Sequence, residues 1–322
     1  MKPNIFIARE IPPEVEAYLG EYCNYTKWDQ DGPIPRETLL NSLRDAEGLL
    51  TSGGKIDGEL LEHAPRLRAV STISVGYNNF DLEAMKARKV IGTNTPDVLN
   101  DTVADLILGL MLAVARRIPE MDRYVKDGSW KRGDDKELFG LDVHHKKLGI
   151  IGMGSIGEAV AQRAKFGFGM DIAYHNRNRK PETEEALDAK YLSLSELLQD
   201  SDFIVLMTPL TPETKGMIGK NEFALMKRTA IFINASRGAT VNEADMVQAL
   251  QEGLIYGAGL DVFEEEPVRP DHPLLAMPNV VTLPHLGSST EHTRFDMAMA
   301  AAKNLVAALQ GHTPPNIVKE LK

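Results

Sequence analysis

The sequence lacks several features that define whole classes of protein. Its 322 residues include one cysteine, Cys23, which excludes an intrachain disulfide and a cluster of thiolate metal ligands. It also has no excess of basic residues, because 36 Lys and Arg stand against 46 Asp and Glu, for a net charge of −10. This charge disfavours a nucleic-acid or anionic-membrane partner, since both bind a concentrated basic surface.

Long hydrophobic runs are missing as well. The N-terminal MKPNIFIARE is interrupted by Arg9 and fits neither a secretory signal nor a membrane span. The longest apolar stretch, 103–115, contains Asp105 and predicts a buried amphipathic helix. We therefore expect a cytoplasmic protein that binds small molecules and has no nucleic-acid or membrane partner. The length favours two domains.

What the sequence does contain is an alternation of short apolar runs with helical patterns, which predicts an α/β fold with parallel sheets. The expected strands form two series, 5–8, 48–51, 69–74 and 90–93, then 148–151, 171–174, 203–207, 230–234, 258–262 and 280–283. Helices are expected over 36–45, 103–117 and 290–309. The polar stretch 127–136 is the boundary that the residue pattern itself suggests.

The segment LGIIGMGSIGEAVAQRAK reads as a strand, a glycine-rich turn and a helix. Gly152, Gly154 and Gly157 form the GxGxxG pattern in which a tight turn brings backbone close to a dinucleotide pyrophosphate. Ser155 and Ile156 would offer N–H groups at the helix N-terminus, where anions are favoured. The alternative interpretation is a glycine-rich turn without a ligand.

The end of the next strand, at YHNRNRK, bears on which dinucleotide is bound. An NAD site usually has an acidic residue there for the ribose 2′-hydroxyl, but the nearest acid downstream is Glu182, beyond the turn. Asn176, Arg177 and Arg179 lie there instead, and Arg177 could bind a 2′-phosphate through paired hydrogen bonds. We expect NADP(H) to be preferred, with NAD(H) possible. An exposed basic turn without a ligand is the alternative.

Three polar residues follow later strands and should reach the same sheet edge as the glycine turn. Arg237 follows AIFIN, Glu266 follows GAGLDVF, and His285 follows VVTLP. Together they suit carbonyl reduction: His285 as general acid, Glu266 as the partner of its other ring nitrogen, and Arg237 as a planar donor for a 2-oxo acid.

Each of the three has an alternative interpretation when taken alone. Arg237 could form a surface ion pair, Glu266 could be one of three acids in a solvated loop, and His285 could be a core histidine. Their shared position after strands of a dinucleotide fold favours the catalytic interpretation. The other histidines show no metal-ligand spacing, so no metal is expected.

These motifs occur together in one known family. GMGSIG, NASRG, LDVFEEEP and PHLGSST, with SVGYNNFD and TPDVLNDTVADLILGLMLAVARR upstream, resemble the D-isomer-specific 2-hydroxyacid dehydrogenases over essentially the whole chain. Within that family, HNRNRK and AKFGFGMDIAYHNR are most similar to the glyoxylate/hydroxypyruvate reductases and bacterial 2-ketogluconate reductases.

The resemblance implies two Rossmann-like domains, in which residues 100–286 bind the dinucleotide and are inserted into a flavodoxin-like substrate domain made of 1–99 and 287–322. It assigns the three catalytic roles to Arg237, Glu266 and His285. It also implies a homodimer built through the segment 118–143. The further residues implied to contact the substrate are Val75, Gly76 and Ser288, and those implied to contact the cofactor are Thr102, Thr208, Pro209, Ala235 and Asp261.

The expected function is therefore an NADPH-preferring reductase that converts a small 2-oxo acid to a D-2-hydroxy acid. Glyoxylate, hydroxypyruvate and 2-ketogluconate differ only in the tail, and the sequence does not choose among them. The alternative is a dinucleotide-sensing binding protein of the corepressor type on the same fold, against which the complete catalytic set argues.

Overall fold

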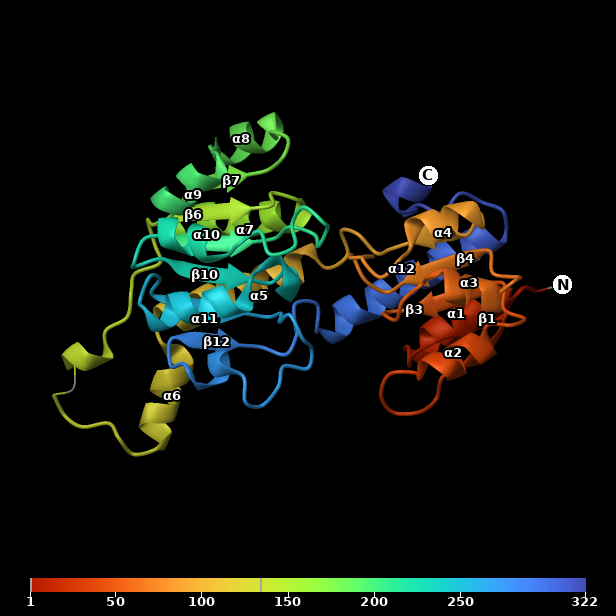
Figure 1. Ribbon diagram of the computed structural model, residues 1–322, viewed down its shortest axis with the longest axis horizontal. Coiled ribbons are helices and arrows are strands. Elements are labelled where there is room, and N and C mark those ends of the chain that lie inside the picture. Colours follow the sequence, from red (N-terminus) through yellow and green to blue (C-terminus); the bar gives the residue numbers. More distant parts are fainter. Residues whose placement is uncertain (1, 134) are drawn as a thin grey trace. The chain divides into compact units, whose positions relative to one another are not determined.

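The computed structural model describes residues 2–133 and 135–322, and it is an α/β protein of two compact units (Figure 1). Unit 1 comprises the chain up to Leu99 and from Ser289 onward, whereas unit 2 runs from Asn100 to Ser288. Each unit contains one parallel sheet, so the predicted fold class is confirmed. The stretch 127–136, which the residue pattern suggested as a boundary, lies inside unit 2.

The sheet of unit 1 has the strand order β2-β1-β3-β4-β5, which is the order of flavodoxin-like folds. Its strands are β1 (Asn4–Ile7), β2 (Asn24–Lys27), β3 (Gly48–Thr51), β4 (Ala69–Thr72) and β5 (Ile91–Thr93). The strands β3 and β4 are buried along their whole length, as expected when helices cover both faces of a parallel sheet.

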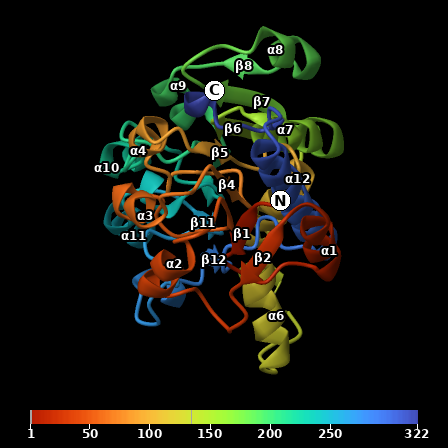
Figure 2. The same cartoon turned by 90° about the vertical axis from the view of Figure 1, so that its right-hand side faces the viewer.

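Helices of unit 1 lie on both faces of this sheet, with α1 and α12 on one face and α2, α3 and α4 on the other (Figure 2). They are α1 (Pro13–Tyr22), α2 (Arg36–Ser42), α3 (Gly58–His63), α4 (Leu82–Ala87) and α12 (Glu291–Leu309). The C-terminal helix packs so closely on β3 that a Cβ atom at Gly48 would lie 2.9 Å from Leu309 and 3.1 Å from Leu305. The last part of the chain therefore completes the fold of the first.

The sheet of unit 2 has the order β12-β11-β10-β9-β6-β7-β8, in which the order reverses between β6 and β9. Ligands of open α/β sheets bind outside the carboxyl ends of the strands at such a point. The strands are β6 (Lys147–Ile151), β7 (Asp171–His175), β8 (Lys190–Tyr191), β9 (Phe203–Leu206), β10 (Ile231–Asn234), β11 (Gly257–Leu260) and β12 (Val280–Thr282).

In unit 2, α5 and α7 pack together on one face of the sheet, while α9, α10 and α11 cover the other. The α-helices are α5 (Asn100–Ala115), α6 (Ile118–Lys126), α7 (Ser155–Phe168), α8 (Pro181–Leu187), α9 (Leu194–Asp200), α10 (Lys220–Leu225) and α11 (Glu243–Gln251). Short 3₁₀ helices are η1 (Asp135–Leu138), η2 (Gly238–Thr240), η3 (Pro273–Ala276) and, in unit 1, η4 (Lys319–Leu321).

Two strands were not expected from the sequence. All four residues of β2 are exposed, and β8 has only two residues, so neither edge strand contains an apolar run. The helix expected over 103–117 begins earlier, at Asn100, and ends at Ala115, because Arg117 adopts a left-handed conformation with φ of 55°.

Candidate active site

The glycine turn between β6 and α7 depends on close backbone contacts. Gly152 has a φ of 101°, and a Cβ atom there would lie 2.8 Å from the carbonyl of Met207. A Cβ at Gly157 would lie 2.7 Å from the Gly152 oxygen, whereas a Cβ at Gly154 would meet nothing within 4 Å. The turn is thus closed on the protein side and open beside the N-terminus of α7, where no side chain caps the helix. This arrangement fits a bound pyrophosphate.

The basic turn after β7 has one cation that forms no ion pair with a neighbouring acid. The carboxylate of Glu184 binds Arg179 at 2.5 Å, and Glu158 binds Lys180 at 2.5 Å. The side chain of Asn176 accepts a hydrogen bond from the N–H of Met153 at 2.7 Å, so it ties this turn to the glycine turn. Within the described part of the chain, Arg177 has no hydrogen bond or ion pair, although its charge contributes to the lowered pKa of Glu213, and its side chain is exposed.

The expected basic cluster is therefore partly neutralised. Two hydrogen bonds lower the pKa of Glu184 to about 2, the larger effect coming from Arg179 and the smaller from Tyr174. This carboxylate is therefore ionised at neutral pH. Among the candidate phosphate ligands, Arg177 is the one that needs no existing ion pair to break.

Arg237 lies in the turn between β10 and η2, where the backbone packs directly against a second loop. A Cβ at Gly238 would lie 1.8 Å from the carbonyl carbon of Phe263, so only glycine fits. The guanidinium of Arg237 donates a hydrogen bond to the Ser236 carbonyl at 2.7 Å. Burial lowers the pKa of Arg237, and the negative charge of Glu266 partly offsets this effect.

Glu266 and His285 form a hydrogen-bonded pair. His285 Nδ1 lies 2.8 Å from Glu266 Oε2, and Glu266 Oε1 accepts the N–H of Phe263 at 3.0 Å. Burial raises the pKa of Glu266, but the bonds from His285 and Phe263 and the charge of Arg237 outweigh it and lower that pKa overall. An ionised Glu266 accepts a hydrogen bond from Nδ1–H, which leaves Nε2 of the half-exposed ring to act on a ligand.

Asp261 fixes the backbone beside His285. Its side chain is buried, and its two oxygens accept the N–H groups of Leu286 at 2.7 Å and Gly287 at 2.8 Å. Burial raises the pKa of Asp261, although the two backbone bonds oppose the shift. Asp261 thus positions the backbone that follows His285.

Sequence reasoning missed a second carboxylate that holds the site. Glu243, at the start of α11, is buried and accepts the N–H of Glu264 at 2.6 Å. Its other oxygen lies 3.3 Å from Nε2 of His272. Glu243 therefore links α11 to the loop that carries Glu266. No spacing in the sequence signals this pair.

The remaining predicted residues lie in both units. Thr102 is in α5, Thr208 and Pro209 follow β9, Ala235 follows β10, and Ser288 ends unit 2. Val75 and Gly76 form a turn after β4 in unit 1, where the Gly76 carbonyl accepts from Ser74 and the Val75 carbonyl from Asn94. Unit 2 by itself brings together Arg237, Glu266, His285 and Asp261.

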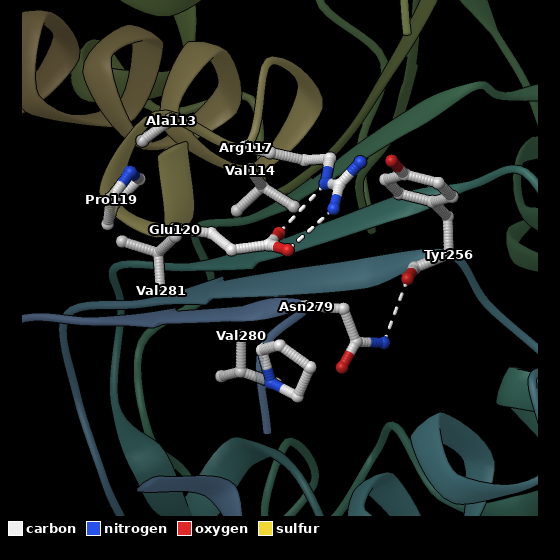
Figure 3. A pocket seen from close by; sticks show the side chains of 10 residues that line it. Ala113, Val114, Arg117, Pro119, Glu120, Tyr256, Asn279, Val280 and Val281 are labelled. Carbon is white, nitrogen blue, oxygen red and sulfur yellow. Dashed lines mark hydrogen bonds and ion pairs between the residues drawn. The ribbon is translucent and has the colours of Figure 1, made fainter. Parts of the chain in front are cut away.

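Helix α6, at the start of the segment 118–143, extends away from the sheet of unit 2 (Figure 1). No residue of α6 is buried, and the exposed large apolar side chains here are Ile118, Val125, Trp130 and Phe139. A hollow of about 220 Å³ lies beside α6, where Arg117 and Glu120 form a doubly hydrogen-bonded pair near Tyr256 and Asn279 (Figure 3). None of the predicted site residues lines this hollow.

Within residues 2–133 and 135–322, no three His, Cys, Asp or Glu side chains are grouped to hold a metal ion. No helix in that part of the chain has both the length and the apolar character needed to cross a membrane.

Comparison with known proteins identifies the family of the chain. Residues 108–287 match the sequence model of the family described as "D-isomer specific 2-hydroxyacid dehydrogenase, NAD binding domain". Glyoxylate/hydroxypyruvate reductase B of Escherichia fergusonii is 51% identical over 318 residues, which cover 99% of this chain and 98% of that protein.

Solved structures match over nearly the whole length. A protein from Thermus thermophilus is 42% identical with a TM-score of 0.90, covering 98% of this chain and 99% of that one. The NADPH-dependent glyoxylate/hydroxypyruvate reductase of Sinorhizobium meliloti, in complex with NADP and malonate, is 33% identical with a TM-score of 0.86, covering 100% and 98%.

Proposed function

Because the chain belongs to the D-isomer-specific 2-hydroxyacid dehydrogenases, we propose that it is an NADPH-preferring reductase of small 2-oxo acids, acting on glyoxylate and hydroxypyruvate. The names of the relatives from Escherichia fergusonii and Sinorhizobium meliloti support these substrates, and the NADP bound to the second supports the cofactor. 2-Ketogluconate, which shares the 2-oxo acid group and differs only in the tail, is a third candidate substrate.

The observation that carries the proposal is the 2.8 Å bond between His285 and Glu266, with Arg237 close enough to act on the same carboxylate. Arg237 would bind the substrate carboxylate through its planar N–H groups. His285 would donate the Nε2 proton to the substrate carbonyl oxygen as that oxygen gains negative charge. Glu266 would accept the hydrogen bond from Nδ1–H, which keeps Nε2 directed at the substrate.

When bound, the reduced nicotinamide supplies the two electrons and the hydrogen that convert the carbonyl carbon to an alcohol carbon. Gly152, Gly154 and Gly157, with the N–H groups of Ser155 and Ile156, would hold its pyrophosphate. Arg177 would bind the 2′-phosphate, assisted by Asn176 and by Arg179 if the latter leaves Glu184. Ala235 and Asp261 would face the nicotinamide, with Thr102, Thr208 and Pro209 as further contacts.

The two units would divide the work. Unit 2 would bind the dinucleotide, and unit 1 would bind the substrate through backbone N–H groups of Val75 and Gly76, with Ser288 at the junction of the units in sequence. Two copies would pair through the segment 118–143, whose apolar side chains are exposed in a single chain. The cytoplasmic location expected from the single cysteine is part of the same proposal.

The test is the loss of NADPH absorbance with glyoxylate, hydroxypyruvate and 2-ketogluconate, compared as kcat/KM and repeated with NADH. We expect turnover with at least the first two acids and a higher kcat/KM with NADPH. Binding of NADPH without turnover of any 2-oxo acid would instead favour a dinucleotide sensor.

A further inference from the structure

Unit 1 contains a hollow that is separate from the residues proposed above to bind cofactor or substrate, because none of those residues lines it. Its volume is about 410 Å³, and it lies between the segment after β1 and the first turns of α12. Two arginines, Arg9 and Arg294, line it together with Ser289 and Thr290, and Ile73 and Ala298 supply apolar contact. The hollow is large enough for a small organic acid.

The two arginines lack a carboxylate partner. Arg9 donates from Nε to the carbonyl of Glu10 at 3.2 Å, and Arg294 donates to the hydroxyl of Ser289 at 2.9 Å. Neither has an ion pair within 4.0 Å in the described part of the chain, although the side chains of Glu10 and Glu291 also line the hollow. Both arginines are partly buried, so solvent only partly hydrates their charges.

This placement is electrostatically unfavourable when the hollow contains only water. Burial lowers the pKa of Arg9, the charge of Arg294 lowers it further, and Glu10 opposes the shift. Arg294 also lies near the N-terminus of α12, where the helix dipole disfavours a cation. A bound anion would offset both effects, and a guanidinium pair matches the paired oxygens of a carboxylate or phosphate.

We infer that Arg9 and Arg294 form a binding site for a small dianion, whose carboxylate or phosphate groups bridge the two guanidinium groups. Two sources share this chemistry. The dianion is either a 2-oxo acid whose tail carries the second anionic group, in which case the inference rests on the proposed function, or a separate small anion. Binding at the hollow is common to both.

The primary experiment is calorimetric titration of malonate, a dianion without a carbonyl to reduce. It is performed on the Arg237→Gln full-length protein, so that the proposed catalytic arginine does not contribute. Adding Arg9→Gln or Arg294→Gln should weaken malonate binding at least about tenfold, the effect of losing one charge-assisted pair. Arg66→Gln, which removes an exposed arginine of unit 1, should leave binding unchanged.

Thermal unfolding of every variant checks that it folds, and Arg294→Lys provides a second test because it keeps the charge while losing the paired donors. The Arg294→Lys protein should bind malonate more weakly than the protein that retains Arg294 and more strongly than the Arg294→Gln protein. The inference is overturned if the Arg237→Gln protein with Arg9 and Arg294 intact shows no measurable malonate binding. It is also overturned if Arg66→Gln weakens malonate binding as much as Arg9→Gln or Arg294→Gln does. This binding assay does not require turnover, so it succeeds or fails independently of the proposed reductase activity.

A kinetic comparison then distinguishes the two sources, using proteins with Arg237 intact. If the hollow binds a substrate tail, Arg294→Gln lowers kcat/KM for oxaloacetate at least about tenfold more than for glyoxylate. If it binds a separate anion, malonate changes the rate with glyoxylate and Arg294→Gln removes that change. If neither kinetic effect is found in a protein that binds malonate, the site has no link to turnover. That result overturns the idea that the hollow binds a substrate tail and leaves the dianion-binding site itself supported.

Discussion

At the scale of the residue, the carboxylate of Glu266 does two things at once. One oxygen holds the imidazole of His285, and the other holds the N–H of Phe263, so the ring orientation is tied to the loop backbone. Because Glu266 is ionised, only a donating Nδ1–H satisfies it, which fixes the role of Nε2 as the atom that faces a ligand.

His285→Ala should lower kcat by about 10² to 10⁴ because it removes the general acid, while NADPH binding is largely kept. Steady-state kinetics and fluorescence titration of NADPH measure the two effects. His312→Ala, at an exposed histidine outside the site, is the control. A His285→Ala enzyme within threefold of wild type would remove His285 from this role.

Glu266→Gln should lower kcat with glyoxylate in steady-state kinetics, because a neutral amide oxygen accepts the Nδ1–H of His285 in a weaker hydrogen bond than the carboxylate does. Glu265→Gln, at an exposed neighbour, should leave kcat unchanged. An unchanged kcat in Glu266→Gln would show that the carboxylate does not position the proton donor.

The same substitution has a stability signature. The pKa of Glu266 is lower in the folded protein, so its ionisation adds stability above the unfolded value, and this contribution is lost as pH falls through the lowered pKa. The difference in Tm between wild type and Glu266→Gln should therefore shrink as the pH is lowered into the acidic range.

Arg177→Asp should raise the KM for NADPH far more than the KM for NADH, because only NADPH carries the 2′-phosphate that this guanidinium would bind. Arg228→Asp reverses another exposed charge of unit 2 and should affect both cofactors little. Equal increases for NADPH and NADH with Arg177→Asp would contradict the 2′-phosphate assignment.

At the scale of the element, the site is held by contacts between loops that follow different strands. The turn after β10 packs on the loop after β11 at Gly238 and Phe263, and Asp261 holds the backbone after β12. Glu243 at the start of α11 adds a hydrogen bond to the same loop. A change at any of these contacts should move catalytic side chains that it does not touch.

Gly238→Ala is the sharpest test of this arrangement. The added methyl would lie 1.8 Å from the Phe263 carbonyl carbon, so the two loops must separate, at a cost of about 3 kcal/mol or more. We expect a lower Tm and a lower kcat with glyoxylate. Gly167→Ala, in α7 where a Cβ meets nothing within 4 Å, should raise stability by up to about 1 kcal/mol and leave activity unchanged.

The sequence predicts elements that have strong apolar patterns and misses those held by their neighbours. A buried strand such as β9 is apolar throughout, whereas β2 is exposed and pairs only at the sheet edge. Arg237, Glu266 and His285 were predictable as a group because parallel strands deliver their following residues to one edge. The hydrogen bonds that Glu243 accepts from the N–H of Glu264 and that Glu184 accepts from Arg179 were not predictable, since they depend on side-chain directions that no spacing encodes.

At the scale of the whole molecule, a net charge of −10 repels the anions that the protein is proposed to bind. Cations are therefore needed locally. Among the described residues, Arg177, Arg9 and Arg294 supply them without an ion pair to a carboxylate. Other arginines, such as Arg117 and Arg163, are neutralised by acids. Ligand attraction thus depends on a few positions rather than on the overall field.

The proposed homodimer is tested at the same scale. By light scattering, the wild-type protein should have twice the 35.5 kDa mass of one chain. Replacing Trp130 and Phe139 together by Ser should shift it toward the single-chain mass, because their apolar surface would no longer be buried by a partner. Phe166→Ser, which removes an equally exposed aromatic side chain outside the segment 118–143, should leave the mass unchanged.

The interleaving of the two units also sets an order for biosynthesis. Unit 2 is encoded as one continuous stretch, whereas the face of unit 1 around Gly48 is covered by Leu305 and Leu309 near the C-terminus. During translation, unit 2 can complete its sheet before α12, the helix that covers one face of the sheet in unit 1, has been synthesised. The N-terminal part of this protein is therefore synthesised first and finished last, and on the ribosome it carries an uncovered apolar surface that chaperones can bind.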